Sequence, residues 1–561
     1  MVIIATMTAF NNKISSLRQE IESGKLEQAH KLISSLENKI EKENLEDQAS
    51  FFNQKAFLSF RTGNFDEAES YFTKAITLFK DAEIEDLEGV SFAFNGLGLT
   101  YYRKGNANQA FQFLRKSLEL RLQIGDHQQL ASSLNNVATI LIEAGASDRA
   151  LDYLAEALDV LENDKAGEDN SSLLSTVYTS IGNVHERDQN FSDALEYYEK
   201  AYEEIQKSWE PWTASIIMYN LANIYIDLGK LSESQEYINQ AIEIQERMGE
   251  KINPVALGKS LFVLARLHIH KNDLSLANIT ADRAVTYLQK KVDNTLGDCY
   301  NLLAWIAWKS GELQEAYDSF MQALKVSEEL GNSIDQLEVL SLLSGLQSDM
   351  NKFLEAEESL KTAQNLLDDP EADERLLILL YAGYLAFKKD EYTRAEKYFH
   401  QVEMEAANED CFNIQIRSLI FQAQTNLQSF YDTNERKFYD QMTSTLRTLE
   451  MIPNWSSYPS AYYLYQVIQA TIVLISAEFE EANDQLMKII EETTAKHYDS
   501  PRTQAGLILD HVTRVKNYMM SESYTDFIEK EVHLLDDLLR ELEQCLEPQP
   551  RAIPQSSELN L

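Results

Sequence analysis

The strongest constraint on how this chain can fold is a small residue that returns at intervals of 39 to 44 residues within one fixed pattern. Five residues before each return stands Gly in six cases and Asn in two, which are the residue types that tolerate a left-handed backbone after a helix. Twelve residues before it stands a second small residue in nine of ten cases, and a bulky residue often follows four residues after it. The return positions are Ala29, Ala68, Ala110, Ala150, Ala194, Ser234, Ala277, Ala316, Ala356 and Ala395.

This pattern predicts a unit of two antiparallel helices joined by a short turn. Small residues at the crossing let the two backbones approach closely, and the bulky residue fills the hole between successive pairs. One such unit cannot bury its own apolar face, so neighbouring units must stack into one elongated core. The chain has only 19 Gly and 9 Pro in 561 residues, too little turn chemistry for a sandwich or barrel of many short strands.

The repeated pattern resembles the tetratricopeptide repeat family. Small residue, Gly, Ala, aromatic and Ala recur in register in NGLGLTYYRKGNANQAFQFLRKSLEL (95–120), IGNVHERDQNFSDALEYYEKAYEEI (181–205) and YNLANIYIDLGKLSESQEYINQAIEI (219–244). The resemblance implies an all-α, right-handed superhelical solenoid of antiparallel helix pairs with about 11–12 repeats. The spacing exceeds the family's 34 residues, which is similar to the long-repeat subgroup of kinesin light chains, polarity adaptors and bacterial peptide receptors.

The register of the repeat divides the chain into four segments. Residues 1–405 hold about ten repeats, and 406–460 hold a degenerate repeat and a joint around the prolines of IPNWSSYP. Residues 461–547 are expected to form a C-terminal repeat with capping helices, because Ala470, Phe479, Ala482 and Leu486 fit the pattern again. The tail 548–561 has three prolines and no apolar periodicity, so we expect it to be disordered.

Charge and cysteine content limit which partners the protein is expected to bind and in which compartment it is expected to lie. The formal net charge is −40, which opposes binding to nucleic acid or to an anionic membrane surface. The three cysteines form no CxxC, no window approaches a membrane span, and the first residues lack a basic signal-peptide region. We therefore expect a cytoplasmic protein, and the sequence leaves its oligomeric state open.

The family resemblance implies that the first helix of each pair lines a concave groove, and Asn recurs on that helix. Asn lies three residues before the small residue, or one residue after it, in six repeats. Its side chain both donates and accepts, which suits the backbone of an extended peptide. The alternative is that each Asn bonds to its own helices. The six are Asn53, Asn95, Asn135, Asn183, Asn223 and Asn301.

Basic and aromatic residues complete the predicted peptide-binding groove. Five of the eight Asp, Glu, Lys or Arg residues at the fifth place after the small residue are basic, so we expect the groove to be nearer neutral than the convex and C-terminal surfaces. Aromatic side chains beside cations favour a ligand with acidic and apolar residues. Packing against the next helix is the alternative, above all for Trp305, whereas Trp308 is expected nearer solvent. These candidates are Arg61, Arg103, Arg187, Arg266, Lys309, Lys388, Trp305, Trp308 and Tyr384.

The sequence offers no catalytic constellation. His268 and His270 lie two residues apart rather than at the four-residue spacing of a helical zinc pair, and there is no phosphate-binding loop or GxSxG. A chaperone-type carboxylate clamp matches at Asn183, Asn223 and Lys259 but departs at Thr179 and Val263. We therefore expect a non-enzymatic scaffold, without cofactor or metal, that binds an extended peptide or short helix of a partner protein. The alternative hypothesis is a signalling-peptide sensor that regulates a kinase or transcription factor.

Overall fold

The computed structural model describes residues 9–490 apart from 23–24, 38, 82–85, 164–168, 189, 249–253, 272, 291, 368–373, 409–410, 434, 453–454, 456–464, 467, 471 and 473–483. The described residues are helical and contain no strand, which confirms the predicted all-α class. The predicted C-terminal repeat and tail lie almost wholly outside them, and so do Phe479 and Ala482.

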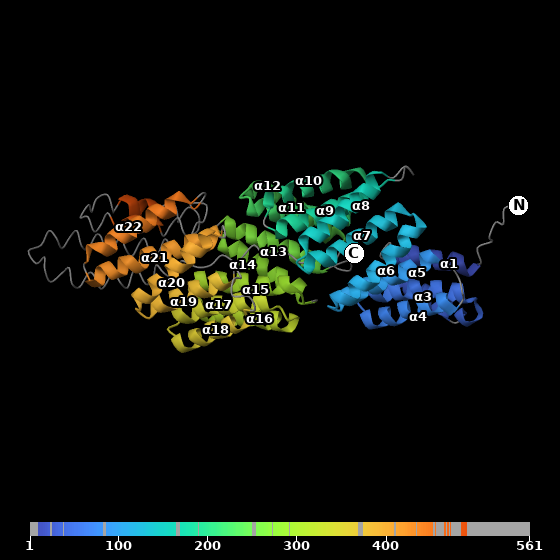
Figure 1. Cartoon of the computed structure of the whole chain (residues 1–561), viewed down its shortest axis with the longest axis horizontal. Coiled ribbons are helices and arrows are strands. Elements are labelled where there is room, and N and C mark those ends of the chain that lie inside the picture. Colours follow the sequence, from blue (N-terminus) through green and yellow to red (C-terminus); the bar gives the residue numbers. More distant parts are fainter. Residues whose placement is uncertain are drawn as a thin grey trace, which may run out of the picture. The chain divides into compact units, whose positions relative to one another are not determined.

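The helices alternate between first and second members of antiparallel pairs (Figure 1). The first helices are α1 (Ala9–Glu22), α3 (Leu45–Arg61), α5 (Leu87–Arg103), α7 (His127–Glu143), α9 (Ser171–Arg187), α11 (Pro211–Asp227), α13 (Pro254–His270), α15 (Asn294–Lys309), α17 (Ser333–Asp349), α19 (Glu374–Lys388) and α21 (Phe412–Thr433). The second helices are α2 (Leu26–Glu37), α4 (Phe65–Asp81), α6 (Ala107–Ile124), α8 (Ser147–Glu162), α10 (Phe191–Lys207), α12 (Leu231–Met248), α14 (Leu274–Leu288), α16 (Leu313–Leu330), α18 (Phe353–Leu366), α20 (Tyr392–Asn408) and α22 (Arg436–Met451).

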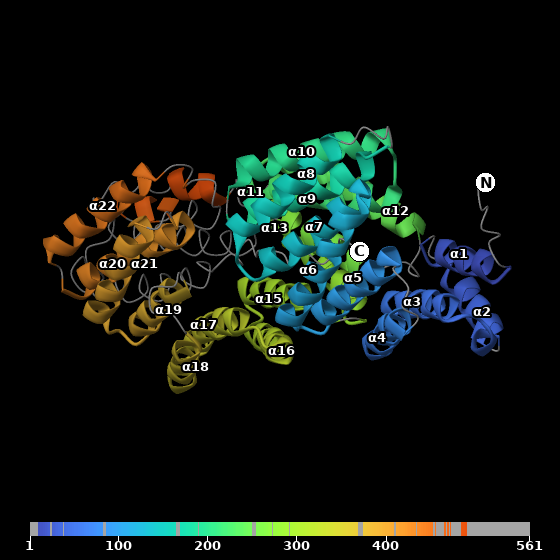
Figure 2. The same cartoon turned by 45° about the vertical axis from the view of Figure 1, so that its right-hand side comes forward.

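The chain divides into two compact units, one through Ala256 and the other from Leu257 onward. In the first unit α3, α5, α7, α9 and α11 contact one another in succession, and in the second unit α15, α17, α19 and α21 do the same. Figure 2 shows α16 and α18 along one side of the row formed by α15, α17 and α19. Within each unit the first helices therefore form a layer of their own, with the second helices packed against it.

The repeat positions behave as their spacing predicts. All ten small residues of the return series, from Ala29 to Ala395, have no exposed surface. The described residues five places earlier have positive φ: five are glycines, such as Gly63 at 81°, and the others are Asn351 at 57° and Asp390 at 60°. A left-handed residue at this place ends the first helix and lets the second fold back at once.

The bulky residue of a second helix can contact the small residue of its own first helix as well as the next pair, as Phe399 does. A Cβ on Gly383 would lie 2.6 Å from the ring of Phe399, which also stacks on Phe421 of the next first helix at 5.2 Å. The sequence predicts only the second of these contacts. The side chain thus joins its own pair together and joins that pair to the following one.

Two first helices have no exposed face. Every residue of α11 from Ala214 to Ile226 is buried, and so is every residue of α17 from Leu337 to Asp349. Their apolar residues are spread around the helix rather than confined to one stripe, as in WTASIIMYNLANIYI and LEVLSLLSGL. The solvent-facing groove wall expected from the family resemblance is therefore missing along these helices.

We predict that two glycine-to-alanine substitutions will have opposite effects. Gly182→Ala should destabilise the fold by about 1–3 kcal/mol, because the new methyl would lie 2.5 Å from the fully buried ring of Tyr198. Gly297→Ala should be neutral or stabilising by about 0.5–1 kcal/mol, since its Cβ would meet Val326 at an ordinary 3.5 Å and helical glycine is unfavourable. Thermal unfolding followed by circular dichroism measures both, and equal losses would contradict the account of the small positions.

Candidate functional site

All the predicted binding residues lie on first helices, and most of them face the seam between one first helix and its neighbour. We use "seam" for the contact between consecutive first helices of one unit. Asn53 donates to the carbonyl of Gly89 at 2.9 Å, and Asn136 donates to Asn95 at 3.2 Å. Arg187 donates to the carbonyl of Ile142. Several of the predicted side chains are thus already bonded across a seam rather than standing in open solvent.

In the first unit the seam between α9 and α11 holds a continuous polar network. The buried hydroxyl of Tyr198 lies 2.8 Å from Asn183 Oδ1 and also contacts Glu186. Asn223 donates to Glu186 at 2.6 Å. Burial beside the Glu186 carboxylate raises the pKa of Tyr198 well above its usual value, so the phenol stays protonated and can donate. The sequence predicts Asn183 and Asn223 as site residues, but not their bonding to Tyr198 and Glu186.

In the second unit Asp349 joins three consecutive first helices. Its carboxylate accepts from Trp308 Nε1 at 2.9 Å and from the Tyr384 hydroxyl at 2.7 Å, and it lies 3.2 Å from Lys388 Nζ. The Asp349 side chain has no exposed surface and Trp308 is 1% exposed. The expectation that Trp308 lies nearer solvent is wrong, because its place on α15 faces α17. The indole is part of the core and is not available as an open anchor.

Three of the six predicted cations stand beside aromatic rings one turn earlier on their own helices. Arg61 lies 6.0 Å from the ring of Phe57, and Lys309 lies 5.6 Å from that of Trp305. Lys388 lies 5.9 Å from the ring of Tyr384. Among the predicted cations, Arg61 is exposed, whereas Lys309 is 7% exposed and Arg266 is 8% exposed. Arg103 and Asn95 are half-buried.

We predict that Asp349→Asn will cost about 3–5 kcal/mol of unfolding free energy, because it leaves the largely buried Lys388 ammonium without its carboxylate. Adding Lys388→Met to that variant should recover part of the loss. The matched control is Asp318→Asn on the exposed side of α16, which should change stability by less than about 0.5 kcal/mol. Urea denaturation measures all three, and a loss no larger than the control's would show that the Asp349 network does not stabilise the unit.

Several buried polar atoms on the first helices have no hydrogen-bond partner. Asn53, Asn135 and Asn301 stand at the same place in their repeats, and the Oδ1 atom of each is buried and accepts nothing. One turn after Asn301, the buried Trp305 Nε1 donates to nothing. An unsatisfied buried polar atom costs about 1–3 kcal/mol, so its recurrence at one register requires an explanation.

A group of carboxylates lies at the start of α15 and α17 in the second unit. Asp293 and Asp298 belong to the first of these helix starts, and Asp335 and Glu338 to the second. Burial, followed by the charges of Asp335, Glu338 and Asp293, raises the pKa of Asp298 well above its usual value. Burial and then Glu338 raise the pKa of Asp335 to about 6. The repeat pattern does not single out this group, although Asp298 and Glu338 share one place, six residues before the small residue.

We predict that Asp335 makes the protein more stable as the solution is acidified. An unfolded aspartate titrates near pH 4, so between about pH 6 and pH 4 the folded state binds more protons than the unfolded state. The free energy of unfolding should therefore rise as pH falls from 7 through this window, and Asp335→Asn should rise less. Melting temperatures of both proteins at pH 7.0 and 5.0 give the comparison, and identical pH shifts would contradict the assignment.

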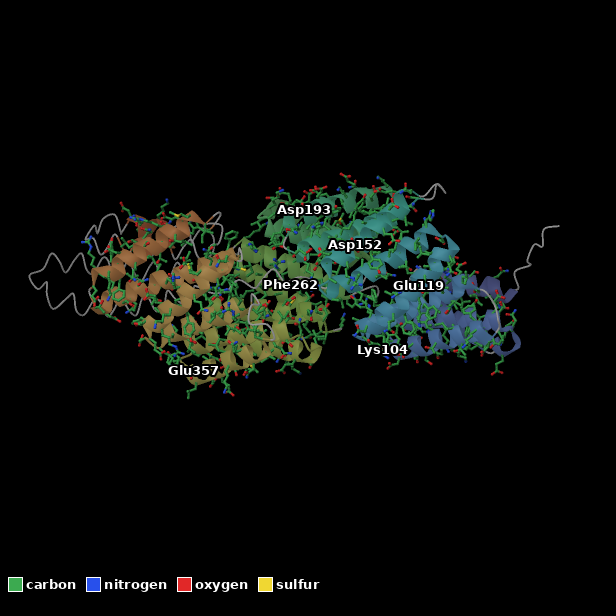
Figure 3. All side chains as sticks on the ribbon, viewed as in Figure 1. Lys104, Glu119, Asp152, Asp193, Phe262 and Glu357 are labelled. Carbon is green, nitrogen blue, oxygen red and sulfur yellow. The ribbon has the colours of Figure 1, made fainter. Side chains whose placement is uncertain are left out.

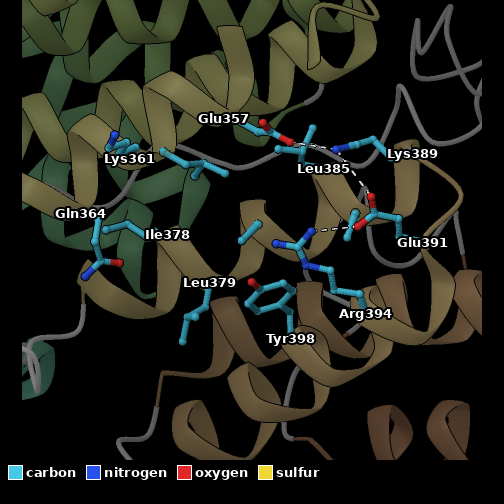
Figure 4. A pocket seen from close by; sticks show the side chains of 13 residues that line it. Glu357, Lys361, Gln364, Ile378, Leu379, Leu385, Lys389, Glu391, Arg394 and Tyr398 are labelled. Carbon is cyan, nitrogen blue, oxygen red and sulfur yellow. Dashed lines mark hydrogen bonds and ion pairs between the residues drawn. The ribbon is translucent and has the colours of Figure 1, made fainter. Parts of the chain in front are cut away.

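One hollow of about 270 Å³ lies outside the seams, between α18, α19 and α20 (Figure 4). Ile378 and Leu379 are among the apolar residues that line it. On its rim Lys389 lies 2.8 Å from Glu357 and 3.5 Å from Glu391, which in turn lies 2.9 Å from Arg394. These rim charges neutralise one another, so we do not place the binding site here.

Acidic residues gather on the second helices. Figure 3 labels four exposed examples, Glu119, Asp152, Asp193 and Glu357, on α6, α8, α10 and α18. Helix α10 carries five acidic residues and two lysines, whereas the first helix after it, α11, has Asp227 as its one charged residue. Acidic residues are thus more frequent on these second helices, whereas the carboxylates at the start of α15 and α17 place acidic residues on first helices as well.

Three further features of the described residues bear on function. No helix in this part of the chain is both long and apolar enough to cross a membrane. Within the same residues no three His, Cys, Asp or Glu side chains are placed to hold one metal ion. Of the three clamp-like matches, Lys259 is 3% exposed and lies 3.1 Å from Asp293, so its ammonium is already engaged inside the protein.

Comparison with known proteins agrees with this architecture. Residues 138–343 match the MalT-like TPR region, and residues 47–123 and 91–163 match the tetratricopeptide repeat. The photosystem I assembly protein Ycf3 of Rippkaea orientalis (strain PCC 8801 / RF-1) is 30% identical over 81 residues, which are 14% of this chain and 45% of that protein. The chain thus matches less than half the length of this curated relative.

Solved structures with similar helical arrays are more distant. The apo form of RapI has 14% identity, covers 64% of this chain and 97% of its own, and gives a TM-score of 0.46. The apo quorum sensor NprR from B. thuringiensis has 14% identity, covers 64% and 87%, and gives a TM-score of 0.40.

The stacked antiparallel pairs with a buried small residue at each crossing define an α-solenoid. With the matches over residues 47–343, the chain belongs to the tetratricopeptide repeat family.

Proposed function

We propose that this protein is a scaffold that binds an extended peptide or a short helix of a partner protein along the inner layer of first helices. The observation that carries the proposal is the recurrence of buried, unpartnered amide oxygens at one register, on Asn53, Asn135 and Asn301. Solenoids of this kind use the surface made by successive repeats to bind other proteins. No enzymatic role is proposed.

The chemistry of these atoms suits a peptide backbone. Rotation about the terminal side-chain bond of Asn is broad and two-fold, so the amide can turn toward the inner surface. There its oxygen accepts from a backbone N–H and its nitrogen donates to a backbone carbonyl. The indole N–H of Trp305, one turn after Asn301, adds a donor. Hydrogen bonds that the free protein leaves unmade are then made with the ligand.

We predict that peptides selected from a displayed random library on the whole chain will lose at least about tenfold in affinity when Asn53→Ala and Asn135→Ala, both in the first unit, are combined. Each lost hydrogen bond to a buried polar group is worth about 0.5–1.5 kcal/mol. The matched control is Asn239→Ala, an exposed asparagine of the second helix α12. Fluorescence anisotropy with a labelled selected peptide measures the affinities. Equal binding by the double variant and the control would contradict the proposal.

The sensor hypothesis differs from the static scaffold in one measurable way. A sensor must change its conformation when the peptide binds, because a ligand shifts an equilibrium only by binding one state more tightly. Small-angle scattering of the chain with and without a saturating selected peptide separates the two. A changed radius of gyration favours the sensor, whereas an unchanged one favours the scaffold.

A further inference from the structure

Three helix pairs of the first unit share a pair of stacked rings. One ring lies three residues after the small residue of the first helix, and the other lies three residues after the small residue of the second helix. The two rings are parallel to within 15°, and their centroids are 5.3 to 5.7 Å apart. The pairs are Tyr101 with Phe113, His185 with Tyr197, and Tyr225 with Tyr237.

The pair formed by α19 and α20 has only the second of these rings. Tyr398 stands at the ring position of α20, whereas Ala386 stands at the matching position of α19. A further ring that flanks Phe113 from the other side, Phe94, is replaced in α19 by Leu379. Within the described part of the chain, Tyr398 therefore has no stacking ring from its own first helix.

The missing rings coincide with the hollow between α18, α19 and α20. Its volume is about 270 Å³, and Tyr398, Ala386 and Leu379 all line it. Figure 4 shows the Tyr398 ring between Leu379 and Arg394. An apolar cavity of about 150 Å³ is large enough to bind benzene, so this hollow has room for one aromatic ring and a short substituent.

The hollow is apolar inside and open to solvent. Ile378, Leu385 and Ala386 are buried, whereas Leu379 and Tyr398 are half-buried. The lining also includes four exposed residues, so a ligand reaches the Tyr398 ring without the displacement of a helix. These four are Glu357, Lys361, Gln364 and Arg394.

The charged side chains that line the hollow include one more base than acids. Lys389 lies 2.8 Å from Glu357, and Arg394 lies 2.9 Å from Glu391, so these four charges are paired. The remaining base is Lys361, and no carboxylate of a described residue forms an ion pair with it. In a chain with a net charge of −40, this excess of positive charge favours an anionic group on the ligand.

We propose that the hollow binds an aromatic ring that carries a carboxylate a few bonds away, with the ring stacked on Tyr398 and the carboxylate beside Lys361. A free aromatic acid and a peptide that ends in an aromatic residue share this chemistry. Stacked rings attract each other beyond the burial of their area, and the ligand restores a contact that other helix pairs make internally. The site is separate from the peptide-binding layer of first helices and goes beyond the function proposed above.

The test uses the whole chain and fluorine NMR with para-fluorophenylpropionate as the probe. The probe should bind with a Kd of about 1 mM or tighter, as expected for a ligand of this size. Its uncharged analogue para-fluorophenylpropanol should bind at least about threefold more weakly, because it lacks the charge that meets Lys361. The peptide acetyl-Gly-Gly-Phe, with a free carboxyl end, is tested for displacement of the probe, and its C-terminal amide is the matched control.

Three substitutions locate the bound probe. Ala386→Tyr supplies the ring that the other pairs have, so it should fill the hollow and abolish binding. Tyr398→Leu removes the stacking ring and should weaken binding at least about threefold. Lys361→Gln should make the propionate and the alcohol bind within about twofold of each other. The matched control is Lys397→Gln, an exposed lysine of α20 outside the hollow, which should leave both affinities unchanged.

Each outcome either supports or overturns the proposal. Binding of the propionate without displacement by the peptide supports a free aromatic acid as the ligand, whereas displacement by the peptide acid but not by its amide supports a peptide carboxyl end. Failure of both to bind, equal binding of the propionate and the alcohol, or binding that persists in Ala386→Tyr overturns the site. The variants that test peptide binding lie in the first unit, so the two proposals fail independently.

Thermal melting shows whether the filled variant is folded. Because the new ring of Ala386→Tyr takes up space that is empty and stacks on Tyr398, its melting temperature should equal or exceed that of the unchanged protein. If this variant does not fold, the affinity of Tyr398→Leu decides, and an affinity equal to that of the unchanged protein overturns the proposal.

Discussion

The structure depends on one contact that recurs along the chain, the insertion of a bulky second-helix side chain over a residue with little or no side chain on the first helix. At Gly182 the approach is so close that a Cβ would collide with the Tyr198 ring, and Gly383 meets Phe399 in the same way. This contact sets the distance between the two helices of a pair. Because the Phe399 ring also stacks on Phe421 of the following pair, it helps to fix the spacing of the repeats as well.

The close stacking of first helices explains why polar residues collect in the seams. Neighbouring first helices come near enough for side chains 35 to 41 residues apart in sequence to bond directly, as Tyr384 and Trp308 do with Asp349. A buried polar group that lacks a hydrogen-bond partner lowers the stability of the fold. In some seams the partners are present, and in others, such as that at Asn301, they are not. The candidate functional positions are those where the protein has left the bonding incomplete.

The repeat period predicts the fold well because it reports contacts inside one pair. The buried alanines and the left-handed turns follow directly from residue size and backbone freedom. The position of Trp308 is not predictable in this way, since it depends on how neighbouring first helices are rotated against each other. The carboxylates at the start of α15 and α17 cannot be predicted from the sequence for a related reason. Asp298 and Glu338 become neighbours only when two repeats are stacked, although their common register is visible in the sequence.

Contacts confined to adjacent helices have a consequence for how such a chain withstands damage. Within each unit a helix contacts the members of its own pair and of the adjoining pairs. Stability is then a sum of local contributions, and cooperativity weakens with distance along the stack. A destabilising substitution in one helix pair lowers the stability of the adjoining pairs and leaves the stability of remote pairs unchanged. Hydrogen exchange should therefore reveal segments that open separately, so that a partner could hold one stretch of the solenoid while another frays.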